Sequence, residues 1–289
     1  AMVKIQEGCD QVCSYCIVPK VRGRERSTPL DSLITQIKSL EDNGFREVVL
    51  TGTQLGTYGF DIPGDNLLSL LTTILEQTTV PRIRISSLQP QWINDDLLDL
   101  WRNPRLCPHF HIPLQSGSDS VLKRMRRRYT SEDFATTSQL IRSRIPDVSI
   151  TTDVIAGFPG ESHEEFQETY DLCKLIQFSD MHVFPYSKRP GTSAAYLVNH
   201  VNDTYKARRV EMLIELMKEF ASLSREKHLN QTRQVLWESV RTLEGRRQWS
   251  GLTDTYQRVH ANDNRNLINT ITDTEILWHS NEHLWGQVH

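Results

Sequence analysis

Three cysteines crowded into eight consecutive residues are the most reactive feature of the sequence. They are spaced Cys9-x3-Cys13-x2-Cys16, whereas Cys107 and Cys173 lie far away in apolar stretches typical of buried core cysteines. Five is an odd number, which argues against a disulfide framework, and closely spaced thiols indicate a metal or cluster site. Three thiolates in one loop suit a 4Fe–4S cluster with one iron left open. The alternative is a zinc knuckle, which needs a distant histidine as its fourth ligand.

The overall composition is that of an ordinary globular protein. The chain has 289 residues, 38% hydrophobic and 24% charged, and a formal net charge of -3. This length predicts about two domains. No apolar run approaches the roughly 18 residues that a membrane span needs, and the first residues lack an apolar signal-peptide core. We therefore expect a cytoplasmic protein with no membrane association.

The elements that must position the cysteines form a repeating pattern. Residues 3–5, 47–50, 82–85, 109–112, 148–151 and 181–184 are short apolar runs that predict strands. Apolar residues with a 3.6-residue period predict helices between them, with starts marked by Thr28-Pro29 and by Ser162 followed by Glu165. This alternation favours an α/β fold, a partial TIM-like (β/α)6 barrel. The cysteines follow the first strand, at the mouth where such barrels place their chemistry.

The hydrophobic pattern of the sequence changes near residue 230. A long amphipathic helix is predicted from about Asp203 to Leu229. Beyond it, residues 234–240, 256–259, 269–276 and 284–288 read as short strands joined by polar turns. The sequence therefore predicts a first domain over residues 1–229 and a small C-terminal all-β barrel over residues 230–289.

The cysteine spacing and its flanks carry a family resemblance. Cys9, Cys13 and Cys16, with Tyr15 before the last cysteine, resemble the radical S-adenosylmethionine superfamily. The stretches KIQEGC at 4–9, HIPLQSGS at 111–118, KRMRRRY at 123–129 and TDVIAGFPGE at 152–161 are similar to the tRNA methylthiotransferases. Residues 50–59 and 184–192 favour the branch that modifies threonylcarbamoyladenosine. Residues 251–256 lie in what resembles that family's TRAM domain, a small RNA-binding barrel.

The resemblance implies a chemistry and a set of partners. It implies a 4Fe–4S cluster whose open iron binds S-adenosylmethionine, reductive cleavage of that molecule, and 2-methylthiolation of threonylcarbamoyladenosine beside the tRNA anticodon. It also implies the tRNA anticodon loop as substrate and a flavodoxin or ferredoxin as reductant, and we expect a monomer. Relatives carry an N-terminal domain with a second 4Fe–4S cluster. That domain is missing before Val3, so we expect a truncated form without the sulfur-donating cluster.

Other readings remain open at this point. The same machinery could act on isopentenyl-adenosine in tRNA or on an aspartate of a ribosomal protein. A reading from a different class is a zinc-containing module that only binds RNA. The metal content separates the last reading from the enzymatic ones.

Cofactor contacts are expected from residues at strand ends and in the family motifs. The expected set is Tyr15, Thr51, Gly52, Ser87, Gln115, Ser116, Lys123, Arg128, Asp153, Gly157, Phe158 and Tyr186. Among them, Arg128 and Lys123 would pair with the methionine carboxylate, and Asp153 with Phe158 would wall the adenine. Two alternatives give these residues a structural role only: Asp153 caps a helix, and the small residues allow tight turns. Arg124, Arg126 and Arg127 are interpreted as a solvated or RNA-facing stripe.

RNA contacts are expected in two places. Arg22, Arg24 and Arg26 directly follow the cysteines and would meet phosphates. Arg246, Arg247, Trp249 and Tyr256 combine cations with aromatic faces, a mixture that single-stranded RNA loops use. His109 and His111 flank the core of a predicted strand and are interpreted as core or supporting residues.

Overall fold

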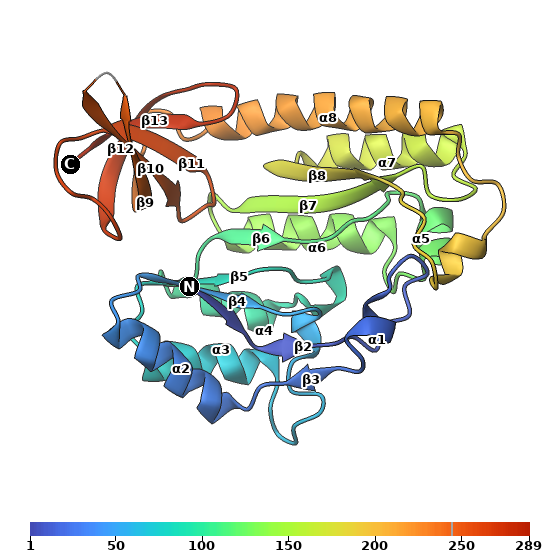
Figure 1. The fold of residues 1–289 in the computed structure, drawn as a ribbon, viewed down its shortest axis with the longest axis horizontal. Helices are drawn as coiled ribbons and strands as arrows, with labels where there is room; N and C mark the ends of the chain where they lie inside the picture. Colours follow the sequence, from blue (N-terminus) through green and yellow to red (C-terminus); the bar gives the residue numbers. More distant parts are fainter. Residues whose placement is uncertain (244) are drawn as a thin grey trace.

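The computed structural model describes residues 1–243 and 245–289, and six parallel strands form its α/β part. Strands β1 (Met2–Lys4), β4 (Glu47–Thr51) and β5 (Arg82–Ile85) make one three-stranded sheet. Strands β6 (His109–His111), β7 (Ser149–Ala156) and β8 (Asp180–Pro185) make a second. A parallel bridge between Ile83 and Leu106 continues the first sheet toward the second (Figure 1). The predicted partial barrel is confirmed.

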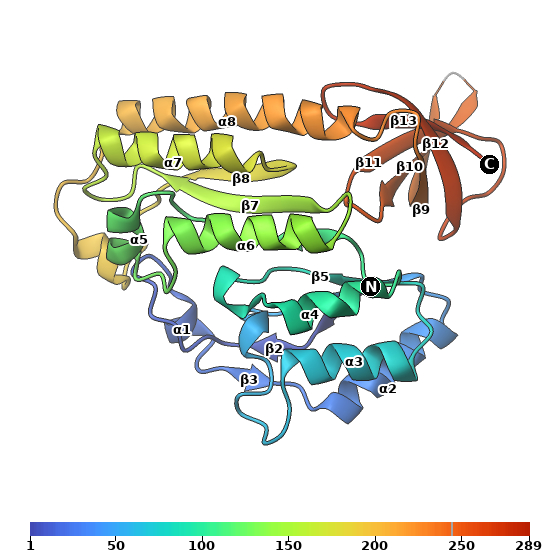
Figure 2. The same ribbon diagram turned by 180° about the vertical axis from the view of Figure 1, so that it is seen from behind.

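Helices cover the outer side of these sheets and leave the inner side open. The main covering helices are α2 (Leu30–Asp42), α3 (Leu67–Gln77), α4 (Asp95–Asp99), α6 (Ser131–Arg144) and α7 (His163–Ile176). Shorter elements are α1 (Val18–Val21), α5 (Asp119–Met125), β2 (Gln6–Glu7), β3 (Arg26–Ser27) and the 3-10 turns Leu55–Thr57, Pro90–Trp92, Leu100–Arg102 and Ser193–Tyr196. Seen from behind, α3, α4 and α6 lie over the strands (Figure 2). The apolar faces of α2, α3 and α7 supply much of the core.

Helix starts follow the expected capping chemistry only in part. The hydroxyl of Ser162 accepts a hydrogen bond from the Glu165 N–H, and the Glu165 side chain accepts one from the Ser162 N–H, which completes a capping box. The expected cap at Thr28 is wrong. The Thr28 hydroxyl donates instead to the carbonyl oxygen of Lys4, and α2 starts without a side-chain cap.

The C-terminal part is a closed five-stranded barrel that follows the long helix α8 (Asp203–Glu226). Its strands are β9 (Thr232–Leu243), β10 (Arg246–Thr253), β11 (Arg258–Asn262), β12 (Ile271–His279) and β13 (Leu284–Val288), in the order β10-β11-β13-β12-β9. The barrel has its own core, centred on Trp237 and Trp249. Strand β10 was missed from sequence because its alternation is interrupted by two arginines and a glycine.

Two buried arginines join this barrel to the sheets. Arg82 and Arg84 project from β5, and both pair with the buried carboxylate of Glu47, at 3.7 and 2.9 Å. Arg82 donates to the carbonyl oxygens of Leu252 and Gln234 in the barrel. Arg84 donates to the carbonyl oxygens of Asp254 and Thr253. The barrel is therefore docked at the end of the sheets where β5 and β6 begin, away from α1 (Figure 1).

Hydropathy adds one negative result. Among the described residues, no helix combines the length and the apolar character that crossing a bilayer requires.

Candidate cluster and cofactor site

The three cysteines lie in the loop that leads from β2 to α1. All three are free thiols and half-buried. The backbone N–H of Gln11 donates to Cys9 Sγ at 3.4 Å, and the N–H of Cys16 donates to the carbonyl oxygen of Cys13 at 3.1 Å. Burial raises the pKa of the Cys9 thiol to about 11. The loop thus presents three sulfur ligands together.

Arg127 stands directly against this loop, which corrects its interpretation as a solvated or RNA-facing residue. Its guanidinium donates from Nη1 to Cys13 Sγ at 3.4 Å and from Nε to the Tyr129 hydroxyl at 3.0 Å. The same guanidinium lies over the Tyr129 ring, 4.9 Å from its centroid. Helix α5 ends at Arg126 in the left-handed conformation, and this turn directs the next side chain inward. A fixed positive charge therefore faces one sulfur ligand.

A network of buried glutamines supports the other side of the loop, and sequence reasoning missed it. Gln11 and Gln89 exchange two amide hydrogen bonds, at 3.1 and 3.2 Å, and Gln89 also donates to Gln54 at 3.0 Å. Gln6 accepts from the backbone N–H groups of Thr53 and Gln54. Glutamine is mostly exposed in proteins, so four buried ones in β2 and three separate loops are a tertiary feature.

A cavity of about 320 Å³ opens beside the loop. Its lining brings together five of the residues expected around the cluster and cofactor: Tyr15, Cys16, Gln115, Asp153 and Tyr186. Ile155, Phe184, Pro185, Ser187 and Arg189 complete the lining. Several segments far apart in sequence therefore meet beside the cysteines, as the positions at strand ends predict.

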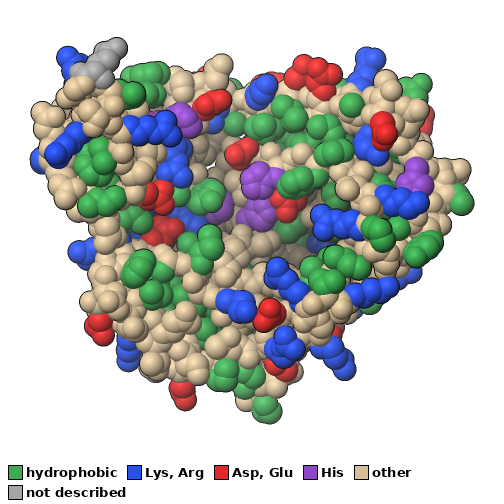
Figure 3. All heavy atoms as spheres, viewed as in Figure 1, with side chains coloured by type: hydrophobic (Ala, Val, Ile, Leu, Met, Phe, Trp, Pro, Cys, Tyr) green, Lys and Arg blue, Asp and Glu red, His purple; other side chains and the backbone are tan. Residues whose placement is uncertain are grey.

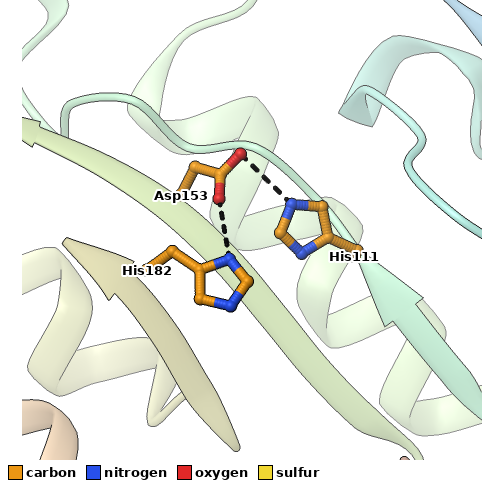
Figure 4. Close-up of side chains that lie close together, drawn as sticks. All are labelled: His111, Asp153 and His182. Carbon is orange, nitrogen blue, oxygen red and sulfur yellow. Dashed lines mark hydrogen bonds and ion pairs between the residues drawn. The ribbon is translucent and has the colours of Figure 1, made fainter. Parts of the chain in front are cut away.

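Asp153 is the centre of a polar cluster on the inner wall of the sheets. Its carboxylate lies 3.3 Å from Nε2 of His111 and 3.2 Å from Nδ1 of His182 (Figure 4). Burial raises the pKa of Asp153, but the hydrogen bonds and charges of the two histidines outweigh it and keep the pKa below its ordinary value. Asp153 caps no helix. The exposed His182 was not recognised from sequence, because only the strand register brings it to Asp153.

Three expected cofactor contacts are packing residues instead. Ser116 is fully buried, and its hydroxyl bonds to Thr169 of α7 at 3.0 Å. Phe158 is also fully buried and packs edge-on against Tyr186, so it supports the cavity wall without lining it. Gly157, at a φ of +75°, has no room for a side chain because Lys206 stands where its Cβ would be. The prediction that the side chains of Ser116 and Phe158 contact a cofactor directly is therefore wrong.

The remaining expected contacts are not gathered in this cavity. The Thr51 carbonyl already accepts a hydrogen bond from the Ile5 N–H at 2.8 Å, whereas Gly52 lies in close contact with Gln6 and Leu55 beside the glutamine network. Ser87 and the exposed Lys123 are absent from the lining. Arg128 faces a separate hollow of about 420 Å³, together with Gln11 and Arg24. The half-buried Arg127, and not its neighbour Arg128, therefore lies beside the cysteines.

The expected RNA contacts are divided by the fold. Arg22, Arg24, Arg26, Arg246 and Arg247 are exposed, although Arg24 pairs with Asp10 at 3.4 Å and Arg26 with Glu7 at 3.9 Å. Trp249 is only 2% exposed, and its indole nitrogen donates to the carbonyl oxygen of Asp263. The prediction that Trp249 stacks on RNA is therefore wrong. Tyr256 is held in the joint between barrel and sheets, stacked on His109 at 4.6 Å and covered by Arg84 at 5.0 Å. Its side chain is still 50% exposed, so contact of Tyr256 with RNA stays a prediction.

The residues around the loop fit the expected cluster and cofactor. Three half-buried thiols in one loop, one of them facing the Arg127 guanidinium, are a donor set that suits a 4Fe–4S cluster. Buried polar atoms without protein partners surround the loop, namely Thr53 Oγ1, Gln54 Nε2, Arg127 Nη2 and the Tyr186 hydroxyl. Unpaired buried donors are costly, so a polar molecule with charged ends matches this site.

Comparison with curated proteins finds relatives that modify tRNA. The chain is 41% identical over 96% of its length to the threonylcarbamoyladenosine tRNA methylthiotransferase MtaB of Bacillus subtilis, of which it covers 62%. It is 42% identical over 82% of its length to the MtaB of Thermotoga maritima, of which it covers 55%. It is also 37% identical over its full length to a tRNA-2-methylthio-N(6)-dimethylallyladenosine synthase of Caldicellulosiruptor saccharolyticus, of which it covers 61%. The chain thus spans roughly three fifths of these relatives.

Solved structures share the fold. The radical S-adenosylmethionine methyltransferase TsrM of Kitasatospora setae superposes with a TM-score of 0.57 at 19% identity, over 67% of this chain and 38% of that protein. Methylornithine synthase (PylB) superposes with a TM-score of 0.53 at 14% identity, over 75% of this chain and 61% of that protein. The family model of the radical SAM superfamily matches residues 3–173, a range that begins within β1, contains the cysteine loop and extends past β7. The chain therefore belongs to the radical SAM superfamily, whose cofactors are a 4Fe–4S cluster and S-adenosylmethionine.

Proposed function

We propose that this chain is the catalytic and RNA-binding part of a tRNA methylthiotransferase that converts threonylcarbamoyladenosine beside the anticodon to its 2-methylthio derivative. The observation that carries the proposal is the three-cysteine loop next to a cavity with polar walls, in a chain 41% identical to an MtaB enzyme. The substrate is a tRNA anticodon loop, and the electron comes from a flavodoxin or ferredoxin. The protein acts as a monomer with one copy of each site.

The residues have distinct tasks in this proposal. Cys9, Cys13 and Cys16 hold the cluster, which when bound supplies the electron that cleaves S-adenosylmethionine. Arg127 places a positive charge beside Cys13 and stabilises the thiolate ligand. Tyr15 and Tyr186 line the cavity, and their rings would keep water from the reacting molecules. The glutamine network holds the loop in one conformation, because the Gln89 amide binds both Gln11 of the loop and Gln54.

The barrel has an exposed aromatic surface that can stack on RNA bases in place of the buried Trp249. Trp278 on β12 is 50% exposed and stacks on Trp285 of β13 with ring centroids 5.0 Å apart. His260 lies 5.3 Å from the Trp285 ring. Burial lowers the pKa of His260, and the positive charges of Arg258, which is paired with Glu238, and of Arg241 lie close enough to lower it further. Stacked rings beside a cation are what single-stranded RNA binds. We therefore assign RNA stacking to Trp278 in place of Trp249.

Replacing Trp278 tests this surface. In Trp278→Ala, the affinity for an anticodon stem-loop is expected to fall about 5- to 100-fold, because one base stack contributes about 1–3 kcal/mol. Fluorescence anisotropy at fixed salt measures the dissociation constant. Leu175→Ala removes another exposed apolar side chain, 67% exposed, from the outer helix α7 and should leave the affinity unchanged. Equal losses in both variants would contradict the assignment.

The proposed reaction is tested on cellular tRNA. Mass spectrometry of tRNA nucleosides from cells without the full-length protein should show loss of 2-methylthio-threonylcarbamoyladenosine and a matching rise of its precursor. The 2-methylthio derivative of dimethylallyladenosine, the product named for another relative, should be unchanged. Loss of the dimethylallyl derivative instead would assign the protein to that second reaction. No change in either nucleoside would refute both.

A further inference from the structure

We infer that His182, oriented by Asp153 and His111, recognises the acidic amino-acid substituent on the substrate adenosine. The inference rests on the proposed function and adds to it the residues that select the substrate. The inner wall of the sheets would then bind the carboxylate and the hydroxyl of that substituent. An adenosine with an apolar substituent would be bound poorly at the same place.

The histidine cluster lies in the same hollow as the cavity beside the cysteine loop. Figure 3 shows a hollow in the open face of the molecule, with histidine and acidic side chains gathered in it. Asp153 belongs both to this cluster and to the lining of the cavity that contains Cys16. A purine held beside the cysteine loop can therefore extend a substituent toward Asp153 and His182 without leaving the hollow.

The cluster is held by hydrogen bonds at the His111 end and is exposed at the His182 end. His111 donates from Nε2 to Asp153, and its Nδ1 lies 3.0 Å from the Thr151 hydroxyl. That hydroxyl also lies 3.0 Å from Nε2 of His109, which is buried behind it. His109 is kept neutral because burial, Arg84 and His111 lower its pKa well below the ordinary value. Asp153 and His111 are therefore anchored from behind by a chain of hydrogen bonds.

His182 is the free end of this chain. Its side chain is 62% exposed, and its Nδ1 is bound to Asp153. The second ring nitrogen points away from Asp153 (Figure 4) and has no hydrogen-bond partner within residues 1–243 and 245–289. An imidazole with one nitrogen fixed by a carboxylate presents the other in a defined direction. His182 is thus a preoriented hydrogen-bonding group at the edge of the cavity.

The side chains of this wall determine which ligand groups can bind there. A protonated His182 can bridge the Asp153 carboxylate and a ligand carboxylate through its two N–H groups, which needs one proton and no other group. The neighbouring Phe184 ring, 6.4 Å away, covers the aliphatic part of such a ligand. An alkenyl group packed here would desolvate Asp153 and His182 and return no hydrogen bond. The wall therefore favours an acidic substituent and rejects an apolar one.

Binding of modified stem-loops by this chain tests the inference. Three anticodon stem-loops are compared by fluorescence anisotropy, with threonylcarbamoyladenosine, dimethylallyladenosine or plain adenosine at the modified position. We expect wild type to prefer the first, and His182→Leu to weaken only that binding about 10- to 100-fold, since a hydrogen bond to a charged group contributes about 1.5–3 kcal/mol. His182→Gln should restore part of the preference, because its amide can still donate. His163→Leu, an exposed histidine at the start of α7, serves as the matched control.

The possible failures are distinguishable. A His182→Leu variant that keeps the wild-type ratio of affinities for the three RNAs would overturn the inference, while the nucleoside analysis above would still decide the reaction. The ligand atoms of His111, Asp153 and His182 lie within 4.8 Å of one another, which also suits a divalent metal. Stoichiometric zinc binding that is lost in Asp153→Asn and abolishes the RNA preference would likewise overturn the inference.

Discussion

Cys13→Ala should contain almost no iron after anaerobic reconstitution, whereas the wild-type chain should hold about four iron and four labile sulfide atoms. The physical reason is that each of the three thiolates holds one corner of the cluster, and no other described cysteine is near the loop, since Cys107 and Cys173 are buried in the core. The visible absorbance and the release of 5′-deoxyadenosine from S-adenosylmethionine under dithionite should be lost together.

Cys173→Ala is the matched control for this experiment. Its thiol is fully buried on α7, and burial raises the pKa of that thiol to about 12. The substitution removes one sulfur atom from the core and should cost about 1 kcal/mol of stability. Iron content should be unchanged. A Cys13→Ala protein that keeps the full chromophore would refute the assignment of the loop, and one bound zinc per wild-type chain would favour the binding-only module.

Glu47→Gln should lower the free energy of unfolding by about 3–5 kcal/mol, the cost of leaving buried charge uncompensated. Glu47 is the carboxylate that both Arg82 and Arg84 contact, and the two arginines are only 3% and 2% exposed. With Gln at this position, two guanidinium groups remain buried without a counter-charge. Because these arginines also bind four barrel carbonyls, we expect the barrel to loosen from the sheets.

Urea unfolding measures the loss of stability, and hydrogen exchange at residues 252–254 measures the loosening of the barrel. The control is Glu238→Gln, which breaks the exposed pair of Glu238 with Arg258. Such surface pairs contribute about 0–1 kcal/mol, so this variant should unfold almost as wild type does. Equal stability of the two variants would show that the arginine joint does not hold the barrel in place.

Much of the fold could be predicted from sequence because its signals are local. The six strand segments and the helices α2, α3, α7 and α8 follow hydrophobic periodicity, which neighbouring residues determine. The cysteine loop could be predicted as well, since three ligands within eight residues need only one turn of chain to meet. The strand β10 could not, because it begins with two arginines and its buried positions after Trp249 hold Gly251 and Thr253, so no apolar alternation is visible.

The errors in the candidate site concern adjacent residues whose directions depend on distant contacts. In the arginine run of residues 126–128, the left-handed turn at Arg126 points Arg127 to Cys13 and leaves Arg128 outside. Trp249 faces the barrel core because β10 pairs with both β9 and β11, a closure that no local pattern reveals.

The amino-acid sequence alone was sufficient for the fold class and the family resemblance, because these depend on residue type and short-range spacing, and it predicts the three cysteines as cluster ligands on the same basis. The polar wall of the cavity and the arginine joint arise only on folding. His111 meets Thr151, and Asp153 meets His182, through the register of three parallel strands separated by long crossover connections. Side chains so far apart in sequence are brought together by backbone pairing and core packing, and those are properties of the whole chain.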